Sequence, residues 1–86
     1  MKLNIDYENQ PEKFLKRLDK NLLLRIFNCL ERLKENPVPS NAKRMKGHKE
    51  PTFRIRIGKY RILYRINYEN NLIVVVKIDK RERVYD

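Results

Sequence analysis

The pattern of apolar and polar residues predicts that the chain begins with a strand. Near the N-terminus, Leu3, Ile5 and Tyr7 alternate with polar residues. A period of two is typical of a strand that buries one face and leaves the other in water. We therefore expect a half-buried strand over residues 1–7.

The next segment predicts a hairpin of two helices. Pro11 suits the first position of a helix that starts after Asn9 or Gln10. Apolar residues then recur at helical spacing: Phe14, Leu15 and Leu18. Asp19 is suited to cap a second helix that ends before Pro37. That helix has a broad apolar stripe: Leu22, Leu23, Ile26, Phe27, Leu30 and Leu33. One bent helix is the alternative, and we favour two.

The second half of the chain reads as strands. Residues 36–51 show neither a helical nor a strand period and predict a basic connecting loop. Three strand-like runs follow, over residues 52–57, 59–66 and 72–78, and residues 81–85 form either a tail or a final strand. A strand, two helices and then consecutive strands indicate an α+β fold with a mostly antiparallel sheet and helices on one face. We expect residues 1–86 to form a single domain.

The run TFRIRIGKYRILYRI predicts a hairpin that sorts its side chains by type. Gly58 and Lys59 suit a two-residue turn, so residues 57, 56 and 54 lie opposite residues 60, 61 and 63. The arginines then share one face: Arg54, Arg56, Arg61 and Arg65. The apolar residues share the other: Phe53, Ile55, Ile57, Tyr60, Ile62, Tyr64 and Ile66. We expect the helices to cover the apolar face and leave the arginines to solvent or a ligand.

The register of the following hairpin stays open. A turn at Asn70 and Asn71 brings residues 72–78 beside residues 59–66. If Glu69 lies opposite Leu72, then Lys80 lies opposite Arg61, whereas a one-residue bulge places Arg81 there.

Charge makes the arginine face a candidate binding site. The formal net charge is +10, from 21 Lys and Arg against 11 Asp and Glu. Residues 43–86 carry 13 basic and 5 acidic side chains, whereas residues 1–42 carry 8 and 6. Opposed arginines repel each other, and the acids nearest in sequence, Glu50 and Glu69, are too few to neutralise them. A bound polyanion, above all a nucleic acid, would supply the missing charge.

Several other classes of protein are disfavoured. No apolar run approaches the roughly 18 residues that cross a membrane, and the acidic N-terminus does not resemble an export signal. Cys29 is the only cysteine, so no internal disulfide or cysteine zinc cluster can form, and we expect a buried structural thiol. Ser40 and Thr52 lie near no histidine and acid pair, which disfavours a serine-type triad. We expect a cytoplasmic protein with no membrane partner and no cofactor.

Three motifs in order resemble the RelE/ParE superfamily of bacterial and archaeal toxins, and its RelE branch most closely. They are AKRMKG, the strand YRILYRI and the ending KRERVYD, and the resemblance covers nearly the whole chain. It implies a RelE-like fold and the toxin of a type II toxin–antitoxin system. The implied activity is metal-free, ribosome-dependent cleavage of mRNA in the A site. The implied partners are the ribosome, mRNA and a RelB-like antitoxin, with a possible toxin–antitoxin hetero-oligomer.

The resemblance also implies roles for particular residues. Arg61, Arg81 and Tyr85 match catalytic positions of the family. Arg54 and Arg56 match positions where the family often has lysines, and an arginine does not readily accept a proton. We assign Arg61 and Arg81 to stabilisation of the transition state. We assign the remaining basic candidates to RNA binding: Arg54, Arg56, Lys43, Arg44, Lys46 and Lys80.

The proton acceptor stays open. Tyr85 either stacks on a base, acts as the base or lies on the core, while Glu50 and Glu82 are weaker candidates. We expect His48 to be solvated and all three phenylalanines to lie in the core: Phe14, Phe27 and Phe53. Two other functions remain as alternatives: a ParE-like toxin that inhibits gyrase, and a noncatalytic module that binds nucleic acid.

Overall fold

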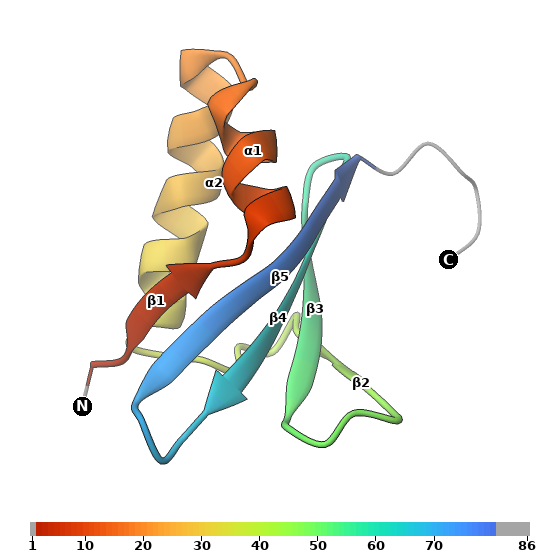
Figure 1. Cartoon of the computed structure of the whole chain (residues 1–86). Helices are drawn as coiled ribbons and strands as arrows, with labels where there is room; N and C mark the ends of the chain where they lie inside the picture. The colour runs from red at the N-terminus through yellow and green to blue at the C-terminus, as the bar shows by residue number, and fades with distance from the viewer. Residues whose placement is uncertain (1, 81–86) are drawn as a thin grey trace.

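The computed structural model describes residues 2–80, which form two helices and five strands (Figure 1). The elements follow the chain as β1 Asn4–Tyr7, α1 Asn9–Lys16, α2 Lys20–Leu33, β2 Lys43–Met45, β3 Thr52–Ile57, β4 Tyr60–Asn67 and β5 Leu72–Lys80. The sheet order is β1-β5-β4-β3-β2, with β1 parallel to β5 and the other pairs antiparallel. The expected α+β class is confirmed, and the expected final strand over residues 81–85 lies outside the described residues.

Both helices cover the same face of the sheet (Figure 1). Asp19 caps α2 as expected, because its Oδ1 accepts a hydrogen bond of 2.9 Å from the backbone N–H of Leu22. Pro11 is the third residue of α1 rather than the first. Within residues 2–80, neither helix is both long and apolar enough to cross a membrane.

The core lies between α2 and the central strands. Ile26, Leu30 and Leu33 of α2 are buried. So are the inward residues of the strands: Phe53, Ile55, Ile62, Tyr64, Ile66, Ile73, Val75 and Ile78. Burying one such side chain fully contributes about 1.5–3 kcal/mol, so this layer supplies most of the stabilisation of the fold.

The expectation that Phe27 lies in the core is wrong, because its side chain is 47% exposed. A helix turns by about 100° per residue. Because Ile26 and Leu30 point at the sheet, Phe27 points to the side of α2 that the sheet does not cover. Leu24 is 50% exposed on the same outer side. Phe53 is buried and Phe14 packs at the margin of the core, as expected.

The β3–β4 hairpin has the predicted register. Residues 57, 56 and 54 lie opposite residues 60, 61 and 63. Gly58 has a φ of 57°, which a two-residue turn with glycine at its first central position requires. The apolar face of the hairpin therefore packs on the helices, and its arginine face points away from them.

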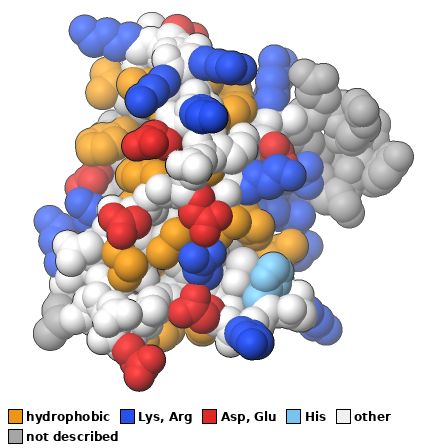
Figure 2. Space-filling view, in the orientation of Figure 1, with side chains coloured by type: hydrophobic (Ala, Val, Ile, Leu, Met, Phe, Trp, Pro, Cys, Tyr) orange, Lys and Arg blue, Asp and Glu red, His pale blue; other side chains and the backbone are white. Residues whose placement is uncertain are grey.

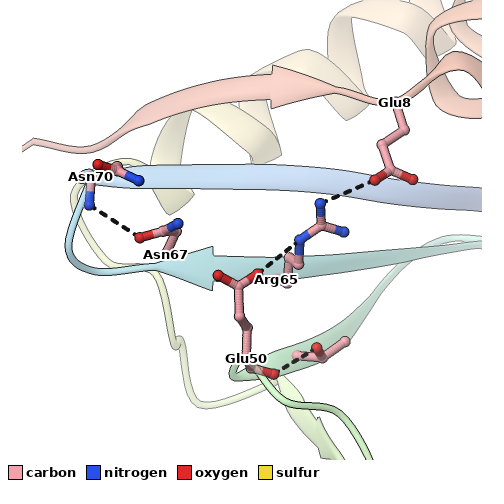
Figure 3. A network of polar contacts seen from close by, with 6 residues as sticks. Glu8, Glu50, Arg65, Asn67 and Asn70 are labelled. Carbon is pink, nitrogen blue, oxygen red and sulfur yellow. Dashed lines mark hydrogen bonds and ion pairs between the residues drawn. The ribbon is translucent and has the colours of Figure 1, made fainter.

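The β4–β5 register differs from both expectations. Asn67 lies opposite Leu72, and the turn between them is closed by a hydrogen bond of 3.1 Å from the Asn70 N–H to Asn67 Oδ1 (Figure 3). Further along, Leu63 pairs with Lys77 but Tyr64 pairs with Val75, so Val76 is the extra residue of a β-bulge. Asp79, and neither Lys80 nor Arg81, lies opposite Arg61.

The bulge keeps charge out of the core. Ile73, Val75 and Ile78 are all buried, whereas strict alternation after Val75 would turn Lys77 inward. The side-chain amide of Gln10 in α1 hydrogen-bonds both backbone groups of Ile78, the second residue after the bulge. Its Nε2 donates to the carbonyl oxygen of Ile78 and its Oε1 accepts from the Ile78 N–H, both at 2.9 Å. Gln10 thus extends the pairing of β5 beyond the point where β1 ends.

The loop predicted over residues 36–51 contains a short strand, β2, which pairs with the first half of β3. Three residues are too few to show a period. The sequence pattern therefore could not reveal this strand.

Candidate nucleic-acid interface

Three arginines lie on the face of the sheet that the helices leave uncovered. Arg54 and Arg56 come from β3 and Arg61 from β4, and the hairpin register puts them on the same side. Arg54 and Arg61 are half-buried, whereas Arg56 is exposed. Figure 2 shows Lys and Arg side chains gathered on the right of the view, over these strands.

The short strand β2 adds one lysine to this face. Lys43 lies opposite Arg54 and therefore points to the same side. Lys43, Arg54 and Arg56 line a hollow of about 500 Å³ together with residues 40–42. A phosphate group that entered this hollow would meet three cationic side chains.

Arg44 and Lys80 belong to the opposite face. Arg44 lies opposite Phe53, and its guanidinium carbon is 5.6 Å from the centroid of the Phe53 ring. Lys80 lies opposite Tyr60, whose ring packs edge-to-face on Phe14 of α1 with centroids 5.8 Å apart. The structure therefore does not bring these two residues into the cluster formed by Arg54, Arg56, Arg61 and Lys43.

A second hollow lies next to the first, and its lining is mixed. It measures about 170 Å³ and is lined by Met45, Arg54, Arg61, Leu63, Lys77 and Asp79. We call it the Asp79 hollow. Asp79 is the one acidic residue among its lining residues, and Lys77 Nζ lies 3.5 Å from Asp79 Oδ2.

Arg65 shares the arginine face but is engaged by two carboxylates. Its Nη2 lies 3.1 Å from Glu8 Oε2, and its Nε lies 3.0 Å from Glu50 Oε1 (Figure 3). The three side chains join the end of β1, the middle of the sheet and the segment before β3. Arg65 therefore holds these segments together, and its charge is locally balanced.

The remaining candidates lie apart or outside the described part. Lys46 and His48 are exposed in the turn between β2 and β3. Arg81, Glu82 and Tyr85 lie outside residues 2–80. Asp79 and Lys77 were missed by sequence reasoning, because only the bulge at Val76 turns them to the arginine face. Glu8 was missed as well, because it is distant from Arg65 in the sequence.

Burial keeps several ionisable groups in their neutral form. It raises the pKa of Tyr64, whose hydroxyl donates a hydrogen bond of 2.7 Å to the carbonyl oxygen of Pro37. Burial also raises the pKa of Tyr7, and Glu31 adds to this effect. The pKa of Cys29 is raised by burial against a smaller opposite effect of Arg32. These three groups are therefore poorly suited to accept a proton or to act as nucleophiles at neutral pH.

Comparison with known proteins identifies the family. A family model described as the ParE toxin of the type II toxin–antitoxin system parDE matches residues 5–85. The chain belongs to the RelE/ParE superfamily of toxins. A relative named "Putative toxin RelE1" from Methanocaldococcus jannaschii is 36% identical over an alignment of 88 positions, which covers 99% of this chain and 97% of the relative. The chain is thus a RelE-type toxin of a toxin–antitoxin system.

Solved structures of RelE proteins share the fold of this toxin. The archaeal RelE–RelB complex from Pyrococcus horikoshii OT3 matches with a TM-score of 0.86 at 26% identity, over 98% of this chain and all of that one. The isolated Escherichia coli RelE toxin matches with a TM-score of 0.81 at 20% identity, over 94% of this chain and 86% of that one. At that identity the second match supports the fold alone.

Proposed function

We propose that this toxin is a ribosome-dependent endoribonuclease that cleaves mRNA in the A site without a metal ion. The observation that carries the proposal is the cluster of Arg54, Arg56, Arg61 and Lys43 on the uncovered face of a RelE fold. The guanidinium group of an arginine can donate two parallel hydrogen bonds to two oxygens of one phosphate. The backbone phosphates of an mRNA bound there would lie beside these cationic side chains, which could stabilise the charge that develops during cleavage.

The reaction we propose is an attack of the ribose 2′-oxygen on the neighbouring phosphorus. The 2′-hydroxyl gives its proton to a base, the bond from phosphorus to the 5′-oxygen breaks, and the leaving oxygen takes up a proton, which leaves a 2′,3′-cyclic phosphate and a 5′-hydroxyl. The protein must hold the phosphate in line and stabilise the negative charge that develops on it. We assign Arg61 to this charge, and Arg54 and Arg56 to the flanking phosphates. Arg81 and Tyr85 complete the catalytic set through their match to the family motif.

We further propose that a RelB-like antitoxin binds and silences the toxin in the cytoplasm, as a hetero-oligomer. Relatives of the same fold were solved as RelE–RelB complexes. The net charge of +10 favours an acidic antitoxin as well as ribosomal and messenger RNA.

The decisive experiment offers programmed ribosomes with a defined A-site codon to the purified toxin. We expect the wild type to cleave the message and Arg61→Ala to cleave it about 100-fold more slowly or worse, since loss of one such donor typically costs about 10²–10³ in rate. Arg17→Ala is the matched control, because Arg17 is an exposed arginine at the C-terminal end of α1. It should cleave at the wild-type rate.

A 2′-deoxy sugar at the scissile position should abolish cleavage, because the nucleophile is then absent. Three results would contradict the proposal. One is cleavage that survives the 2′-deoxy substitution, and another is a message that is bound but stays intact. The third is an intact message together with inhibited gyrase, which would favour a ParE-like toxin.

A further inference from the structure

Two carboxylates hold the guanidinium group of Arg65 through two different nitrogens (Figure 3). Glu8 Oε2 lies 3.1 Å from Arg65 Nη2, and Glu50 Oε1 lies 3.0 Å from Arg65 Nε. The side chains of Arg65, Glu8 and Glu50 are 34%, 45% and 41% exposed, so a ligand on the uncovered face of the sheet can reach all three. We call these three side chains the Arg65 clasp.

The Arg65 clasp is negatively charged on a strongly basic protein. Two carboxylates against one guanidinium leave a formal charge of −1, whereas the whole chain carries +10. Asp6 of β1 faces the same side of the sheet, because it lies opposite Val74, which in turn lies opposite Arg65. This third carboxylate is two strands from Arg65, or about 10 Å across the sheet. The face is therefore negative beside β1, whereas three cations line the hollow beside β2.

A phosphate that approaches the Arg65 clasp meets more repulsion than attraction. Coulomb energy is inversely proportional to distance. At any one dielectric constant, two carboxylates about 5 Å from a phosphate repel it about 1.6 times as strongly as one guanidinium about 4 Å away attracts it. Nε and Nη2 also form one edge of the guanidinium fork, and carboxylates already occupy both of these donors. Arg65 is thus poorly available to RNA.

We propose that Glu8 and Glu50 set the boundary of the RNA track on the uncovered face, an inference that rests on the proposed function. The carboxylates keep Arg65 out of the set of phosphate-binding residues and repel a further phosphate of the message. The boundary also limits which nucleotides reach Arg61, because the message cannot slide toward β1. The RNA track is the path of the message over the basic cluster: Lys43, Arg54, Arg56 and Arg61.

A purely structural role of the Arg65 clasp predicts a different result. The clasp joins the end of β1 to the segment before β3. If it served only to hold these segments, removal of its carboxylates would leave RNA binding unchanged or weaken it. If it sets a boundary, removal of the same carboxylates releases Arg65 and strengthens RNA binding. The two roles are therefore separated by the sign of the effect.

The test measures binding of 2′-O-methyl uridine oligonucleotides to the full-length toxin by fluorescence anisotropy at several salt concentrations. The methyl group blocks attack by the 2′-oxygen, so binding is measured whether or not the toxin cleaves. We expect the double variant Glu8→Gln/Glu50→Gln to bind more tightly. Its slope of log affinity against log salt should be steeper by about 0.7, the value of one further phosphate contact. Each glutamine keeps a side-chain oxygen that can accept from Arg65, which favours retention of the fold.

The variant Arg65→Gln shows whether the released arginine causes this gain. In the wild type it should leave the slope unchanged, because the carboxylates already engage Arg65. In the double variant it should remove the gain of about 0.7. Glu12→Gln/Glu69→Gln is the matched control, because it removes two charges at exposed positions of α1 and of the β4–β5 turn. It should keep the wild-type slope.

The results also separate this inference from the proposed function. The boundary would be overturned by a slope that falls when Arg65 is replaced in the wild type, by a double variant without a gain, or by a gain that survives Arg65→Gln. Absence of RNA binding in all of these proteins would overturn it as well. Cleavage on programmed ribosomes would then still support the endonuclease. A boundary found in a toxin that cleaves nothing would instead refute the catalytic proposal and leave the track as a binding site.

Discussion

Tyr64 joins the core to the segment that follows α2. Its ring is fully buried and stacks near Phe53, with centroids 5.9 Å apart. Its hydroxyl donates to the carbonyl oxygen of Pro37 at 2.7 Å. One side chain thus contributes apolar burial and also satisfies a backbone carbonyl at the end of the helical layer.

Replacing this hydroxyl should destabilise the toxin in a pH-dependent way. We expect Tyr64→Phe to lower the free energy of unfolding by about 1 kcal/mol at neutral pH. The pKa of Tyr64 is raised above its ordinary value of 10.0 in the folded chain. Above about pH 10 the unfolded chain loses this proton first, so the wild type loses stability as pH rises. The phenylalanine variant has no proton to lose at this position. The difference in free energy of unfolding between the wild type and the variant should therefore become smaller as pH rises.

Urea unfolding at about pH 8 and about pH 11 measures this difference. Tyr68→Phe is the control, because Tyr68 is 56% exposed in the β4–β5 turn and its loss should change little at either pH. A gap for Tyr64→Phe that stays constant between the two pH values would show that burial does not hold this proton.

At the scale of elements, the sequence predicted the pairing of strands that are joined by a short turn of known type. The β3–β4 register follows from a two-residue turn, because once Gly58 is placed every later pair is fixed. The β4–β5 register could not be predicted in this way, since the bulge at Val76 depends on which residues the core accepts. Its supporting contact from Gln10 joins residues 68 positions apart. Phe27 was misplaced because the apolar stripe of α2 is wider than the strip the sheet covers.

The contact between α1 and β5 can be tested at Gln10. We expect Gln10→Ala to lower the free energy of unfolding by about 1–3 kcal/mol, because two backbone groups of Ile78 lose their partner. Hydrogen exchange of the Ile78 amide should accelerate, as measured by NMR. Asn9→Ala, at an exposed neighbouring position of α1, is the control. Unchanged exchange at Ile78 would mean that Gln10 does not hold the bulged register.

At the scale of the whole molecule, the fold places basic side chains in two different settings on one face of the sheet. Glu8 and Glu50 balance Arg65 near one end of the sheet, whereas Lys43, Arg54 and Arg56 line one hollow. Composition revealed the surplus of positive charge but not this division. The acidic partners of Arg65 come from distant parts of the chain, so only the folded arrangement shows that carboxylates balance its charge.

If the arginine face binds RNA as proposed, salt should weaken this binding in proportion to the number of phosphates that the face contacts. For single-stranded RNA the slope of log affinity against log salt changes by about 0.7 for each phosphate contact. We expect Lys43→Ala to reduce the slope by about that amount. Lys13→Ala, on the exposed side of α1, should leave it unchanged. Equal effects of the two substitutions, measured by titration at several salt concentrations, would indicate that RNA binds without preference for this face.

The bulge at Val76 also affects how relatives of this toxin should be aligned. In the stretch LIVVVKIDK, the pairing of one extra residue decides which side chains face the helices and which face the arginine side of the sheet. A relative that kept all nine residues but paired without the bulge would present Val76 and Ile78 where this toxin presents Lys77 and Asp79. Gap placement within this short strand therefore matters as much as residue identity when residues of this face are compared between family members.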